Sequence, residues 1–184
     1  MTKQMDQSKE KGAVLKYLAK FKGQKRTTPL VSPVPTDILI TLIGAFLGIA
    51  ILSILTLEYM TPMLATPLGA SAVLVFGAPD APLSQPRNVI LGHALSAIVG
   101  VTTYQIWGIH WWSVTLGTSL AVLVMLLTKT THPPGGATAM FAILNAAKPI
   151  YVLTPIIAGS LLLVLVGIFV NNLSPNRNYP RYWY

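Results

Sequence analysis

The chain has 184 residues, of which 53% are hydrophobic and only 10% are charged, and its formal net charge is +8. Soluble domains carry about a quarter charged residues, so this composition predicts an integral membrane protein. Cysteine is absent, which excludes disulfides, thiolate catalysis and cysteine-based zinc sites.

The positive charge is concentrated at the N-terminus. Eight of the thirteen Lys and Arg residues precede Pro29, where only Asp6 and Glu10 oppose them. A basic segment before an apolar body is typical of the positive-inside rule, so we expect a cytoplasmic N-terminus and no nucleic-acid partner. Arg177 and Arg181 favour the same side for the tail, residues 172–184.

Residues 1–36 are predicted to form a basic cytoplasmic segment. Within residues 13–21, apolar residues alternate with lysines at helical spacing, which predicts a short amphipathic helix lying on an anionic lipid surface. A plastid transit peptide is the rival interpretation. Such peptides are rich in Ser and Arg and poor in acidic residues, whereas this segment has few Ser and Arg residues and two acidic ones. We therefore expect a bacterial plasma membrane, for instance a cyanobacterial one.

Residues 37–171 are predicted to form an all-α transmembrane domain of six membrane elements. Residues 38–57, 89–107, 113–128 and 152–170 are long enough to span a bilayer, although the third is short. Residues 63–77 and 133–147 are shorter, rich in Gly and Ala, and interrupted or opened by proline, as broken or re-entrant helices are. Four and six crossings both place the termini on one side, and the loop charges favour six.

An internal repeat organises these elements. A shift of sixty-seven positions aligns Pro67 with Pro134 and Gly69 with Gly136, and without a gap it also aligns Gly92 with Gly159. We interpret residues 37–103 and 104–171 as two copies of three elements each. Because three is odd, the copies would have opposite orientations, which is the recurring plan of secondary transporters.

The Pro-Gly turns that open the short helices are the candidate substrate site. Proline presets a helix start, glycine leaves its backbone N–H groups uncovered, and a helix N-terminus attracts anions. The two turns are expected to converge on a small anion such as nitrite, bound without any cofactor or metal. The predicted binding residues are Pro67, Gly69, Ala70, Ser71, His132, Pro134, Gly135, Gly136, Ala137 and Thr138.

The three histidines have alternative interpretations. His132 either contacts the anion or a proton, or caps the helix that follows it. His93 lies inside a predicted span, where an ionisable group indicates function, although an interhelical hydrogen bond explains it equally well. His110 lies among tryptophans and is expected to belong to an interfacial aromatic belt.

His132-Pro133-Pro134-Gly135-Gly136-Ala137 resembles the motif that names the HPP family of integral membrane proteins. The apolar body from about Pro35 to Val170 is similar to the membrane region of that family. The resemblance implies a multi-pass membrane protein, and the cyanobacterial and plastid members of the family are associated with nitrite transport. It does not identify binding residues, which rest on the argument from the Pro-Gly turns.

An enzyme is not expected, because convergent carboxylates, metal-ligand spacing and phosphate loops are missing from the sequence. The function that we predict is a secondary transporter of a small inorganic anion, most specifically nitrite. The alternatives are a small-anion channel and a membrane scaffold or sensor that transports nothing. The small-residue faces around Gly44 and Gly92 are expected to pack helices closely, within one protomer or in a homo-oligomer.

Overall fold

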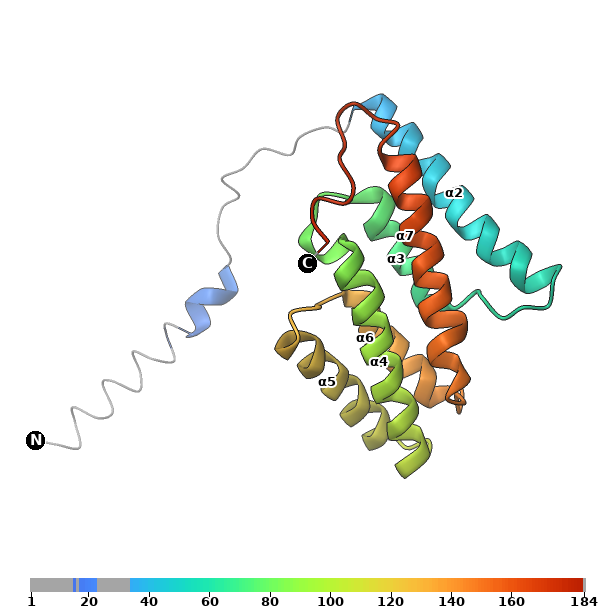
Figure 1. Ribbon diagram of the computed structural model, residues 1–184. Coiled ribbons are helices and arrows are strands. Elements are labelled where there is room, and N and C mark those ends of the chain that lie inside the picture. Colours follow the sequence, from blue (N-terminus) through green and yellow to red (C-terminus); the bar gives the residue numbers. More distant parts are fainter. Residues whose placement is uncertain (1–14, 16, 23–33, 184) are drawn as a thin grey trace, which may run out of the picture. The chain divides into compact units, whose positions relative to one another are not determined.

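The computed structural model describes residue 15, residues 17–22 and residues 34–183, and residues 34–183 form helices joined by short connections (Figure 1). In the N-terminal unit, Leu15 and residues 17–19 are helical and are followed by the 3₁₀ helix η1 (Lys20–Lys22). The rings of Tyr17 and Phe21 meet edge to face, with centroids 5.4 Å apart. The rest of the predicted amphipathic helix, residues 13, 14 and 16, lies outside the described residues.

The second unit contains the membrane domain. Its elements, in chain order, are α2 (Pro35–Leu57), α3 (Thr66–Gly77), η2 (Pro82–Ser84), α4 (Pro86–Trp107), α5 (Trp111–Leu127), α6 (Pro133–Leu144), the π-helical segment η3 (Val152–Ile157) and α7 (Ala158–Asn171). Proline occupies one of the first two positions of α2, α3 and α4 and both of them in α6, where its fixed φ suits a helix start and its missing N–H costs nothing.

Three of these helical stretches are long and apolar enough to cross a membrane: α2, α4 and the continuous stretch Val152–Asn171. The fourth long span that the sequence predicts corresponds to α5, which has 17 residues. The two short elements are the 12-residue helices α3 and α6. The predicted all-α membrane architecture is therefore confirmed, with fewer long spans than expected.

The short helices have tighter bounds than the sequence suggests. Residues 60–65 are not helical, Ala65 before the helix is extended, and the Thr56 hydroxyl accepts hydrogen bonds from the N–H groups of Met63 and Leu64. Helix α6 stops at Leu144, and Ala146 has a φ of 50°. Both helices thus fall well short of the length that a bilayer requires.

The helices pack in two groups that meet at the centre of the domain. Helix α2 packs on α3 and α7, and α5 packs in the same way on α6 and α4. The groups join where α4 contacts α7 and η3, and where α3 contacts α6. The fully buried core includes Leu52, Leu68, Phe76, Ile156 and Leu163.

The small-residue faces predicted for helix packing do pack within this chain. Gly44 and Gly48 lie directly against the Phe76 ring. A Cβ built at Gly100 would lie 2.6 Å from the Ala139 carbonyl oxygen, so α4 and α6 are in backbone contact there. Such close approach strengthens van der Waals packing between helices that no water separates.

The tail after α7 folds back over one end of the domain. Arg177 donates hydrogen bonds to the carbonyl oxygens of Phe76 and Asp37, at 3.0 and 2.8 Å. The buried Tyr179 hydroxyl donates to the Ser84 carbonyl oxygen at 2.8 Å, and burial raises the pKa of this phenol above its usual value. Arg181 forms an ion pair with Asp80 at 2.6 Å. These contacts gather the start of α2, the α3–α4 connection and the tail at the same end.

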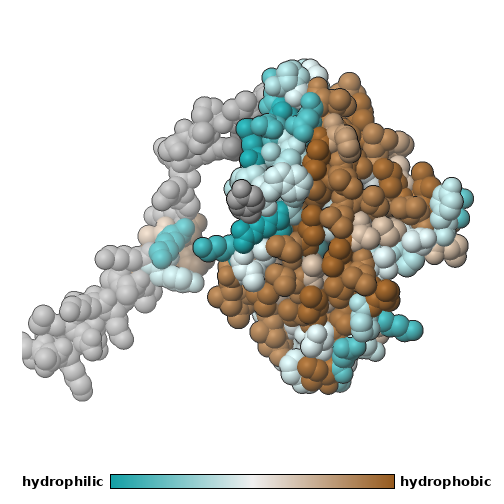
Figure 2. Space-filling view, in the orientation of Figure 1, coloured by the Kyte–Doolittle hydropathy of each residue, from teal (hydrophilic) through white to brown (hydrophobic). Residues whose placement is uncertain are grey.

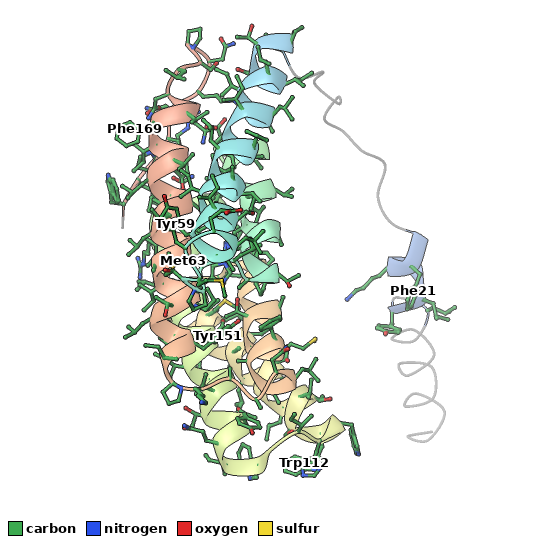
Figure 3. All side chains as sticks on the ribbon, turned by 90° about the vertical axis from the view of Figure 1, so that its right-hand side faces the viewer. Phe21, Tyr59, Met63, Trp112, Tyr151 and Phe169 are labelled. Atoms are coloured by element: carbon green, nitrogen blue, oxygen red, sulfur yellow. The ribbon has the colours of Figure 1, made fainter. Side chains whose placement is uncertain are left out.

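The flanks of the domain are apolar. Figure 2 shows a broad hydrophobic face, with hydrophilic residues gathered toward its edges. Large side chains point outward, among them Phe46, Leu127 and Phe169, which are 69%, 74% and 73% exposed. A lipid environment accommodates such a surface, which water does not. At one end Trp112 stacks on His110, with ring centroids 5.5 Å apart, as an aromatic belt residue would (Figure 3).

Candidate functional site

The first turns of α3 and α6 lie together near the centre of the domain, and the two helices run away from each other in opposite directions (Figures 1 and 3). Their bounds are offset by sixty-seven positions at both ends. Their starting turns also match, because Leu68 N–H donates to Ala65 O and Gly135 N–H donates to His132 O, each at 2.8 Å. Ala65 and His132, the residues before the helices, are both extended.

Ser71, in the second turn of α3, joins two imidazole rings. Its Oγ lies 2.6 Å from Nε2 of His93 and 2.8 Å from Nε2 of His132. The rings meet edge to face, with centroids 4.8 Å apart. All three side chains are fully buried. A serine therefore bridges histidines from α4 and from the start of α6.

Each histidine has a second partner on its other ring nitrogen. His93 Nδ1 lies 2.6 Å from Thr138 Oγ1 on α6, and His132 Nδ1 lies 2.8 Å from the Leu83 carbonyl oxygen in η2. His132 stands at the N-cap position of α6, but its side chain makes no capping hydrogen bond. The capping alternative for this residue is therefore wrong in this structure.

The carbonyl of Leu83 determines the direction of every hydrogen bond in the neutral network. A carbonyl oxygen only accepts, so His132 Nδ1 carries the proton and Nε2 accepts from Ser71. The Ser71 oxygen then accepts from His93 Nε2–H, and His93 Nδ1 accepts from the Thr138 hydroxyl. The order of donation is Thr138, His93, Ser71, His132 and finally the Leu83 carbonyl, and no member lacks a partner.

Not all predicted site residues have the predicted environment. Ser71, His132 and Thr138 meet in this network, and the carbonyls of Pro67 and Pro134 lie 3.3 and 3.2 Å from the Ser71 and Thr138 hydroxyls. The expectation of an open turn at Gly135 is wrong. A Cβ there would lie 2.8 Å from the Ser96 hydroxyl and 3.0 Å from the Gly92 carbonyl oxygen, so α4 covers this glycine.

The other two glycines are open. A Cβ at Gly69 or Gly136 would meet nothing within 4 Å. A cavity of about 280 Å³ lies between α3 and α6, and Ala70 and Ala137 both line it. The remaining lining residues are Thr66, Pro67, Met140, Phe141, Leu144 and Asn145. The cavity is thus mostly apolar, and it lies between the start of α3 and the later turns of α6.

Two residues near the network were not among the predicted binding residues. His93 is the residue that connects the network to α6, and its signal in the sequence was an ionisable side chain inside a predicted span. Ser96, one turn further along α4, has a fully buried hydroxyl with no hydrogen-bond partner within the described part of the chain. No sequence signal distinguishes this serine from a packing residue.

Among the described residues, no cluster of three or more His, Asp or Glu side chains has a geometry that would hold a metal ion. The chemistry available is that of neutral imidazoles and hydroxyls in an apolar surrounding, which can exchange and hold protons and donate hydrogen bonds.

Comparison with known proteins agrees with the membrane architecture. The chain is 38% and 33% identical to two transmembrane proteins of Dictyostelium discoideum, in alignments that cover 92% and 93% of this chain. It spans 58% and 64% of the length of these relatives. No solved structure matches. The family described as the HPP transmembrane region matches residues 31–180, which include the whole network. The chain therefore belongs to the HPP family of transmembrane proteins.

Proposed function

We propose that this domain is a secondary transporter that carries a small inorganic anion across the membrane. The observation that carries the proposal is the meeting of the α3 and α6 first turns around a buried polar network. A helix N-terminus bears partial positive charge, and two of them directed at one region favour an anion there. Half-length helices that meet near the bilayer midplane are the usual substrate site of secondary transporters.

The surroundings of these turns suit a small anion. The backbone is open on the side where a Cβ would lie at Gly69 and Gly136, and the cavity between the start of α3 and the later turns of α6 has room for a small ion. The unpartnered Ser96 hydroxyl offers a further donor near Gly135. No described Lys or Arg lies within α3 or α6, so release would not require breaking an ion pair.

The arrangement of the helices supports six crossings. In this topology α2, α4, α5 and α7 cross, and the chain before each of α3 and α6 completes a crossing with that helix. The ion pair between Arg181 and Asp80 joins the tail to the α3–α4 connection, which favours six crossings, because four crossings would put these two segments on opposite sides. The matched packing of α2 with α7 and α5 with α4 favours an inverted repeat. The basic N-terminal segment favours a cytoplasmic location for both termini.

Nitrite is the first anion to test, because the family resemblance points to it, and nitrate and formate are the comparison anions. Purified protein in liposomes should give saturable nitrite uptake and counterflow. Gly136→Val adds an isopropyl group beside the α6 turn, where its Cβ meets nothing within 4 Å, so it should lower the uptake rate at least tenfold without unfolding the protein. Gly77→Val is the matched control, since it also meets nothing but lies at the far end of α3.

The results separate the alternatives. Conductance without counterflow would indicate a channel, which needs a continuous wet pore rather than a closing site. The absence of flux for all three anions would indicate a scaffold or sensor. Full activity in a folded Gly136→Val protein would remove the proposed site.

A further inference from the structure

The buried network can accept one more proton without losing a hydrogen bond. If His132 Nε2 gains a proton, Ser71 can no longer donate to it and accepts from it instead. The Ser71 hydroxyl proton then has an acceptor in the Pro67 carbonyl oxygen, 3.3 Å away. Rotation of the Ser71 hydroxyl about its Cβ–Oγ bond is therefore enough to give every donor of the protonated network an acceptor.

The other end of the network has the same property. If His93 Nδ1 gains the proton, the Thr138 oxygen accepts from it, and the Thr138 hydroxyl proton turns to the Pro134 carbonyl oxygen at 3.2 Å. Pro67 and Pro134 occupy equivalent positions at the starts of α3 and α6. The added proton can thus be held on either imidazole while every ring nitrogen keeps a partner.

The helices that carry the network and α5 and α7 beside them have no carboxylate to offset the charge that such a proton brings. Helices α3, α5, α6 and α7, together with η2 and η3, contain no Asp, Glu, Lys, Arg or His within their bounds. Helix α4 contributes only Arg87 and Tyr104 besides His93, and the Arg87 guanidinium donates to the Thr128 carbonyl at the domain's end. An unpaired positive charge in an apolar interior is costly. An anion at the neighbouring first turns would offset that cost.

We propose that the His93–Ser71–His132–Thr138 network binds one transported proton together with each anion, which makes the protein a proton–anion symporter. The inference rests on the proposed transport of a small anion and adds its coupling ion. Proton and anion stabilise each other in the occupied site, and each is held weakly without the other. The empty carrier returns with a neutral network, so no net charge crosses the membrane in a cycle.

Proton movement and anion movement are measured in the same liposomes. Vesicles containing a trapped pH-sensitive dye, with the membrane potential clamped, receive external nitrite at equal pH on both sides. The wild type should acidify the lumen by one proton per nitrite taken up, in excess of the nitrous acid leak of protein-free vesicles. An imposed pH difference of one unit, acid outside, should drive about tenfold accumulation, approached faster than in protein-free vesicles.

Variants connect the coupling to the network. In His132→Gln the amide can still donate to Leu83 and accept from Ser71, but it cannot take up a proton, so proton-coupled uptake should fall at least tenfold. His110→Gln removes an exposed histidine outside the site and should retain wild-type coupling. Saturable wild-type uptake with no excess acidification would overturn the symport while preserving anion transport. The absence of saturable uptake would instead overturn the proposed function. If His132→Gln fails to fold, the number of protons taken up per nitrite by the wild type decides whether the protein is a symporter.

Discussion

Gly100 of α4 lies in backbone contact with Ala139 of α6, where an added Cβ would come within 2.6 Å of the Ala139 carbonyl oxygen. This is the interface on which the network depends, because His93 lies two turns earlier on α4 and Thr138 directly precedes Ala139. The position of the imidazole relative to the α6 hydroxyl is therefore set by how closely these two helices approach.

Gly100→Ala should lower the free energy of unfolding by about 1–3 kcal/mol, since an overpacked core must move backbone rather than a flexible side chain. Reversible unfolding in mixed detergent micelles, followed by tryptophan fluorescence, measures it. Gly77→Ala is the matched control, because its Cβ meets nothing within 4 Å. Equal stability of the two variants would mean that α4 and α6 are not in contact.

Arg177→Ala should destabilise the domain strongly. The guanidinium also donates to Thr41 Oγ1 and Asn171 Oδ1, at 2.8 and 2.9 Å, and only 9% of the side chain is exposed. Removing it leaves several buried acceptors unpaired, so we expect a loss of about 3 kcal/mol in the same unfolding assay. Arg181→Ala removes a pair that is about half exposed, and it should cost less than about 1 kcal/mol. Similar losses in both variants would contradict the buried role of Arg177.

Ser71→Ala should cost stability as well as transport. The change leaves two buried ring nitrogens without their shared partner, which predicts a loss of about 1–3 kcal/mol. Ser160→Ala is the comparison, because Ser160 is also buried but bonds only the Ile157 carbonyl of its own helix. A Ser71→Ala protein as stable as Ser160→Ala would mean that the histidines are not bridged.

Six crossings make a prediction about accessibility. The chain contains no cysteine, so single cysteines can be introduced without background labelling. In Asp80→Cys and Asn178→Cys the thiol should react with an impermeant maleimide from one side of intact vesicles. The Ile109→Cys thiol should react only from the other side. Four crossings predict the opposite result. The Ile109→Cys thiol would then react from the same side as the Asn178→Cys thiol, and the Asp80→Cys thiol from the other side.

Much of the site could be predicted from the sequence because its residues lie in a local motif. The prolines and glycines of the two turns predict short helices, and these helices begin within a few residues of the predicted positions. The shift of sixty-seven positions also aligns Ser71 with Thr138, and the two hydroxyls occupy equivalent second-turn positions. The state of Gly135 could not be predicted, since whether a glycine is open or covered depends on the helix packed against it.

By itself, the sequence determined the class of the protein, its helical elements and the equivalence of α3 and α6, because hydrophobicity, proline and glycine act through local geometry. The tertiary structure alone decided that His93 and His132 share one hydroxyl, that Leu83 orients the network, and that the tail covers the α3–α4 connection. These contacts join residues 22 to 95 positions apart. Only the packing of α4 between α6 and α7 brings such residues within hydrogen-bond distance.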